Sequence, residues 1–145
     1  MRVDFYQLSR DPVEQVLPQI AARILDEGER MLVVSADSSQ LDRISAGLWN
    51  AGPASFLAHD RADAPLPEVQ PILLSGTCEP ANGATRIAIA DGQFRDAALG
   101  FDRVFYFFAP ETIAAARESW RALARREDVE THFWRQDGGK WRRGP

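Results

Sequence analysis

The sequence predicts an α/β fold in one domain, with a mostly parallel sheet, helices on both faces and a C-terminal β-hairpin. Short segments rich in strand formers alternate with longer segments of helical periodicity, which is the pattern of βαβ units. No internal repeat and no linker divides the 145 residues, a length that suits a single domain. We therefore expect residues 1–145 to form one unit.

The first strand is predicted at residues 3–8, where VDFYQL alternates and is rich in strand formers. A helix follows, with Asp11 as its cap, Pro12 in its first turn and Gly28 at its end. Pro18 interrupts the helical pattern. Either the helix is kinked there, or a short first turn precedes the main helix.

The second strand is predicted at residues 30–35, a short apolar run that is typical of a strand buried on both faces. The next helix is capped by Ser38 or Ser39 and continues to Trp49. Its expected apolar face consists of Leu41, Ile44, Leu48 and Trp49.

Three more strands are expected in the middle of the chain, at residues 55–58, 69–75 and 85–90. Pro71 indicates that the second of these is an edge strand or begins nearer Ile72, because proline cannot donate a ladder hydrogen bond.

The strongest strand signal is RVFYFF at residues 103–108. A long helix then begins at Pro110 and ends near Arg126. Strands at residues 129–135 and 140–143 are predicted to form a hairpin around the turn QDGG.

Composition and charge restrict the class of protein. A single Cys excludes an internal disulfide, MRVDFYQL is not typical of a signal peptide, and no segment approaches the ~20 apolar residues of a membrane span. We therefore expect a protein of the reducing cytoplasm without membrane contact. The net charge is −4, yet residues 111–145 hold eight Lys and Arg against six Asp and Glu. Either acidic partners bind this basic end, or it is simply a solvated surface.

The sequence carries few residues arranged for catalysis. A nucleotide-binding fold needs a Gly-rich turn after its first strand, but residues 9–12 read SRDP. The adjacent His59 and Asp60 point opposite ways on a strand, so a structural role is favoured for both. His132 and Cys78 lie far from them in sequence, and Cys78 has no activating neighbour. We expect no catalytic residue, no metal site and no cofactor.

The last long helix carries two neighbouring stripes. An apolar stripe that should face the core consists of Ile113, Ala116, Trp120 and Leu123. An arginine stripe beside it consists of Arg117, Arg121 and Arg125. Trp120 is therefore either a core residue or a boundary residue that exposes its indole beside Arg117. The second arrangement would suit an anionic peptide with an aromatic side chain, because Arg binds a carboxylate in a fork.

Several segments together resemble the chi subunit of bacterial DNA polymerase III. They are FYQL at residues 5–8, GLW at 47–49, SFLAH at 55–59, the apolar strand at 103–108, and ARESWR at 116–121. Their order and spacing match over nearly the whole chain, although Ala58 stands where the family usually has Pro.

The resemblance implies a Rossmann-like fold that has lost its nucleotide site, and a non-catalytic accessory subunit of the bacterial cytoplasm. The implied partners are the clamp loader, often through a small subunit called psi, and the acidic, Phe-terminated tail of single-stranded DNA-binding protein. DNA is then contacted only indirectly. For the tail site the resemblance implies Arg117, Trp120 and Arg121, with Phe108 as an apolar wall and Arg125 as a flanking cation.

Two other functions stay open at this point. The C-terminal segment HFWRQDGGKWRR interleaves aromatic and basic residues, which can bind single-stranded nucleic acid directly unless the aromatic side chains pack inward. The second function is that of a nucleotide-binding enzyme with an unusual site, although the absence of a Gly-rich turn argues against it.

Overall fold

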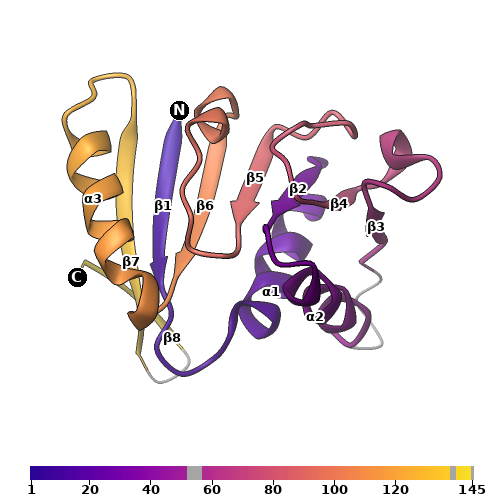
Figure 1. The fold of residues 1–145 in the computed structure, drawn as a ribbon, viewed down its shortest axis with the longest axis horizontal. Coiled ribbons are helices and arrows are strands. Elements are labelled where there is room, and N and C mark those ends of the chain that lie inside the picture. Colours follow the sequence, from indigo (N-terminus) through magenta and orange to yellow (C-terminus); the bar gives the residue numbers. More distant parts are fainter. Residues whose placement is uncertain (52–56, 138–139, 145) are drawn as a thin grey trace.

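The computed structural model describes residues 1–51, 57–137 and 140–144, in which one eight-stranded sheet is flanked by three α-helices (Figure 1). The strands are β1 (Arg2–Gln7), β2 (Met31–Val34), β3 (His59–Arg61), β4 (Ile72–Ser75), β5 (Arg86–Ile89), β6 (Arg103–Phe108), β7 (Glu130–Asp137) and β8 (Lys140–Arg143). The α-helices are α1 (Val13–Asp26), α2 (Ser38–Trp49) and α3 (Ile113–Ala124). None of these helices has the length and apolar character needed to cross a membrane.

The strands lie in the order β3-β4-β2-β5-β6-β1-β7-β8. All neighbouring strands are parallel except β7 and β8, which form an antiparallel hairpin. The predicted Rossmann-like α/β fold with a mostly parallel sheet is therefore confirmed, and so is the C-terminal hairpin. Because β1 lies between β6 and β7, its last residue, Gln7, pairs with Phe108 on one side and Arg135 on the other.

The strands alternate their side chains between two apolar layers. In β1, Tyr6 joins the layer that contains α1 and α2, whereas Val3 and Phe5 join the layer that contains α3. The helices therefore cover opposite faces, as predicted. Figure 1 shows α3 beside β7 and β1 at one end of the sheet, with α1 and α2 toward the other end. Each fully buried apolar side chain contributes roughly 1.5–3 kcal/mol to folding.

Helix α1 is continuous through the buried Pro18, so the arrangement with a separate first turn is wrong. Proline has no N–H group and leaves the backbone oxygen of Glu14, four residues earlier, without its helical donor. Gly47 of α2 packs directly on this oxygen, because a Cβ added to Gly47 would lie only 2.4 Å from it. The missing side chain thus allows α1 and α2 to approach closely.

The two N-terminal caps differ from the prediction. Helix α2 is capped by Asp37, whose Oδ1 accepts a hydrogen bond from the backbone N of Ser39 at 2.9 Å. Helix α1 is preceded by Pro12, and the Asp11 carboxylate instead accepts a hydrogen bond from Nε2 of Gln136 at 2.8 Å. Several capping residues adjoin one another in the sequence, and tertiary contacts decide which of them caps.

Other boundaries also shift. Half of the predicted strand at residues 55–58 lies outside the described residues, and residues 57 and 58 are not in a strand. The strand in this part of the chain is instead β3, His59–Arg61. Strand β4 begins at Ile72, which confirms the later of the two predicted starts. It is not an edge strand, because it lies between β3 and β2. Trp49, expected on the apolar face of α2, is 55% exposed. Strand β7 includes Asp137, two residues beyond the expected end.

Candidate functional site

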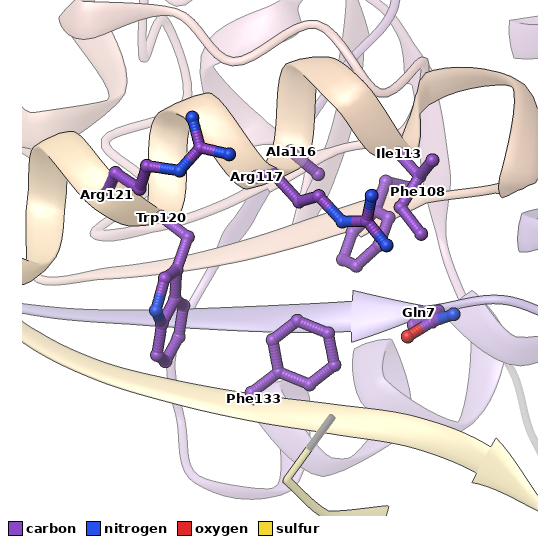
Figure 2. Close-up of a pocket in the computed structure, with 8 residues that line it drawn as sticks. All are labelled: Gln7, Phe108, Ile113, Ala116, Arg117, Trp120, Arg121 and Phe133. Atoms are coloured by element: carbon purple, nitrogen blue, oxygen red, sulfur yellow. The ribbon is translucent and has the colours of Figure 1, made fainter.

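A pocket of about 430 Å³ opens between α3 and the sheet (Figure 2). Gln7 and Phe108 come from the carboxyl ends of β1 and β6, and Phe133 comes from β7. Helix α3 supplies the remaining lining residues, which are Ile113, Ala116, Arg117, Trp120 and Arg121. The pocket therefore combines an aromatic wall built on the sheet with a wall of alternating apolar and basic residues on the helix.

The aromatic wall is a connected cluster of rings. The Trp120 indole packs edge-on against Phe5, with ring centroids 5.0 Å apart, and against Phe133 at 5.6 Å. Phe133 in turn contacts Phe108 at 5.7 Å. Edge-to-face pairs of this kind contribute about 0.5–1.5 kcal/mol beyond the burial of area. These contacts connect the pocket wall to the buried apolar layer of the sheet.

Trp120 is both a core residue and a pocket residue. It is half-buried, and it packs against the apolar layer formed by β1, β6 and α3. It also lines the pocket, so the two predicted roles are not alternatives. This follows from its place in the apolar stripe of α3, in which Ala116 and Leu123 are fully buried. Trp120 is long enough to pack on Phe5 and still reach the pocket edge.

Two exposed arginines lie at the pocket edge. Neither Arg117 nor Arg121 makes an ion pair or a side-chain hydrogen bond within the residues that the structure describes. Arg126, which follows the same helix, forms an ion pair with Asp128 at 2.7 Å. Figure 2 shows the Arg117 guanidinium on the side of the pocket where Gln7 and Phe108 lie. Its donors are therefore available to an anion in the pocket.

The structure brings four of the five predicted site residues together. Phe108, Arg117, Trp120 and Arg121 all line the pocket. Arg125 does not line it; this exposed residue forms the C-terminal cap of α3, one turn beyond Arg121.

Gln7 and Phe133 were not identified as site residues from the sequence. Their contribution depends on the parallel pairing of β1 with β7, which aligns Phe5 with Phe133 and places Gln7 at the pocket mouth. The sequence indicated both strands but carried no signal for this pairing.

The turn after β1 is occupied by the protein itself. The backbone N–H groups of Ser9, Arg10 and Asp11 all donate to Oε1 of Gln136, at 3.1–3.2 Å. In a nucleotide-binding fold of this topology, the amides of this turn face the phosphates. Here the Gln136 side chain from β7 accepts those hydrogen bonds instead.

The other candidates have structural contacts. The His59 ring is held by the Ser45 hydroxyl and the Leu57 carbonyl oxygen, each at 2.8 Å. Burial raises the pKa of the Cys78 thiol, which opposes formation of the reactive thiolate. Within the described ranges, no group of three His, Cys, Asp or Glu side chains is placed to hold a metal ion.

The aromatic residues of the C-terminal hairpin pack inward. Trp134 and Trp141 are half-buried against the layer that contains α1, and Trp134 Nε1 donates to Asp4 at 3.0 Å. Trp141 packs edge-on against Tyr6 at 5.0 Å. These rings are engaged by the protein, which disfavours their use as a platform for stacking bases.

The fold and the pocket define an α/β protein with a ring-lined pocket, at whose edge two guanidinium groups have no ion pair among the described residues. A comparison with protein families gives the relationship. The chain belongs to the family of the DNA polymerase III chi subunit, HolC, whose family model matches residues 1–130. It is accordingly an accessory subunit of the DNA replication machinery. A comparison with curated proteins found no match to this chain.

Proposed function

We propose that this chi-family subunit has no catalytic activity and links the clamp loader to single-stranded DNA-binding protein. It does so by binding the acidic, Phe-terminated tail of that protein in the pocket beside α3. The observation that supports this most directly is the unpaired Arg117 guanidinium at the mouth of a pocket walled by aromatic rings. A terminal Phe presents one ring and one carboxylate, which are the two groups that this pocket complements.

Each group of the tail has a complementary group in the pocket. The terminal ring packs among Phe108, Trp120 and Phe133, and the α-carboxylate accepts two parallel hydrogen bonds from Arg117. Arg121 adds to the positive potential at the pocket edge, which attracts an acidic tail. The pocket volume of about 430 Å³ lies within the roughly 300–1,000 Å³ typical of ligand sites. A short peptide should bind with micromolar affinity, on the order of −8 kcal/mol.

Membership of the family supports a proposal for the assembly. A chi-type subunit works in the bacterial cytoplasm as part of the polymerase complex, attached to the clamp loader directly or through psi. In this arrangement the DNA is contacted by the partner protein, and the chain itself reaches it only through the tail.

The test is titration calorimetry with a tail peptide. Arg117→Ala should weaken binding roughly 30-fold or more, because the carboxylate loses the guanidinium that donates two parallel hydrogen bonds to it. Arg117→Lys should give an intermediate loss, since Lys keeps the charge but not the paired donors. A peptide without the terminal Phe should not bind.

Arg23→Ala is the matched control, because Arg23 is an exposed helical arginine on α1, across the sheet from the pocket. It should leave the affinity unchanged. Unaltered binding by Arg117→Ala, with the fold intact by circular dichroism, would refute the assignment of the tail to this pocket.

A further inference from the structure

We infer that the acidic stretch preceding the terminal Phe is bound along one face of the β7–β8 hairpin, with Arg135 as its principal contact and Lys140 and Arg142 beyond it. The ligand class is an acidic peptide segment, and the inference rests on the proposed function of the α3 pocket. This surface lies outside the part of the chain that the family model matches, which ends at residue 130. Family membership therefore assigns it no role.

Strand pairing places Arg135 next to the pocket. Gln7 and Phe133 both line the pocket, and Arg135 is the residue of β7 that pairs with Gln7. Arg135 also lies two residues after Phe133, so both side chains point to the same face of the sheet. Arg142 of β8 pairs with Arg135 and continues the same face away from the pocket. A chain leaving the pocket past Gln7 therefore meets Arg135 first.

The opposite face of the hairpin fixes it in place. Trp141 packs against Tyr6, and the Gln136 side chain is bonded to the turn between β1 and α1. Because these residues alternate with Arg135 and Arg142, burying them leaves the arginines exposed on the pocket side. The cations are thus held on a supported strand pair, which reduces the entropy lost when a ligand binds.

The charges of this face favour an anionic ligand. It carries Arg135, Lys140 and Arg142 against Asp137, a local excess of two positive charges on a chain whose net charge is −4. Asp137 pairs with Arg142, while Arg135 has no ion pair or side-chain hydrogen bond in the described ranges. Like charges on paired strand positions repel. Asp137 offsets part of this repulsion, and an acidic segment lying over Arg135 would offset more of it.

The experiment compares two peptides that share a terminal Phe. One has the acidic residues before it, and the other has Ser in their place. Arg135→Ala should weaken the acidic peptide about two- to fivefold, as expected for an exposed ion pair, and leave the neutral peptide unchanged. The double variant Arg135→Ala, Arg142→Ala should bind the acidic peptide still more weakly. The affinity of this variant should also depend less on salt concentration than that of the unchanged protein.

Arg143→Ala is the control within the same hairpin. Arg143 has the same charge but pairs with Trp134 on the other face and is hydrogen-bonded to His132. It should bind both peptides like the unchanged protein. All these residues are exposed, so the melting temperatures should be similar.

The outcomes separate this inference from the proposed function. If Arg117→Ala abolishes binding of both peptides but Arg135→Ala affects neither, the hairpin inference is overturned and the pocket stands. The inference is also overturned if the acidic peptide loses its higher affinity over the neutral one in Arg121→Ala and Arg125→Ala but not in Arg135→Ala. In that case the acidic segment lies along α3. Loss of oligonucleotide binding in Arg135→Ala, with peptide binding intact, would assign the surface to nucleic acid. If Arg117→Ala changes neither peptide, the pocket itself is wrong.

Discussion

Asp4 should contribute strongly to stability, and Asp4→Asn tests this. Asp4 lies in β1 with no exposed surface and accepts hydrogen bonds from Arg2, Arg103 and Trp134, the closest from Arg103 Nε at 2.8 Å. Removing one partner of a buried ion pair costs about 3–5 kcal/mol. Asn keeps one acceptor oxygen, and both arginines are about one-third exposed and can turn toward water. We therefore expect a loss of about 2–3 kcal/mol in the free energy of unfolding.

The pH dependence gives a second readout. Burial on its own would raise the Asp4 pKa, but the hydrogen bonds from Arg2, Trp134 and Arg103 outweigh it and lower that pKa below the usual 3.8. Because the folded-state pKa lies below the unfolded one, the carboxylate stabilises the fold fully above pH 3.8. This contribution is lost as the pH falls through the folded-state pKa. The stability difference between Asp4→Asn and the unchanged protein should therefore be constant near neutrality and shrink in acid.

Urea unfolding followed by circular dichroism at pH 7 and pH 3 measures both effects. Asp128→Asn is the matched control, since Asp128 also binds an arginine through two oxygens but is fully exposed. It should change stability little. A difference below about 0.5 kcal/mol for Asp4→Asn at pH 7, or one that stays the same at pH 3, would refute the reasoning.

Two further predictions concern the helices. Gly47→Ala should destabilise the protein by about 1–3 kcal/mol in thermal unfolding despite the better helix propensity of Ala, because its Cβ would meet the Glu14 backbone oxygen. Gly100→Ala, whose Cβ would meet nothing within 4 Å, should be near neutral, and equal effects would contradict this packing. Trp120→Ala should cost about 2–3 kcal/mol of stability, since the ring is half-buried, and should weaken tail-peptide binding more than tenfold. Trp120→Phe should retain most of the stability and most of the peptide affinity. Unchanged peptide affinity in Trp120→Ala would show that Trp120 does not contact the peptide.

The elements were predictable where local periodicity is strong. RVFYFF matches β6 residue for residue. The apolar stripe of α3 is buried or half-buried and the arginine stripe is exposed, as their spacing indicates. The caps were less predictable. Asp37, rather than the adjacent serines, caps α2. Asp11 does not cap α1 and instead accepts a hydrogen bond from Gln136. Neighbouring residues have similar capping ability, so contacts from distant segments decide between them.

The candidate site shows the same division. Arg117, Trp120 and Arg121 share one helix, and their spacing alone puts them on adjoining surfaces. Phe133 and Gln7 joined them only because β7 pairs with β1. That pairing connects residues more than a hundred positions apart, which local patterns cannot report.

The sequence by itself determined the α/β class, the alternation of strands and helices, and the arginine stripe beside Trp120, because these depend on periodicities of two and 3.6 residues. Only the tertiary structure decided that Asp4 is buried among arginines, that Gln136 bonds the turn after β1, and that β7 places Arg135 beside Gln7 of the pocket. The physical reason is that sequence patterns predict a polar strand residue to be exposed to solvent, unless its hydrogen-bond partners are known. Those partners come from other strands, whose order and register are set by packing of the whole sheet.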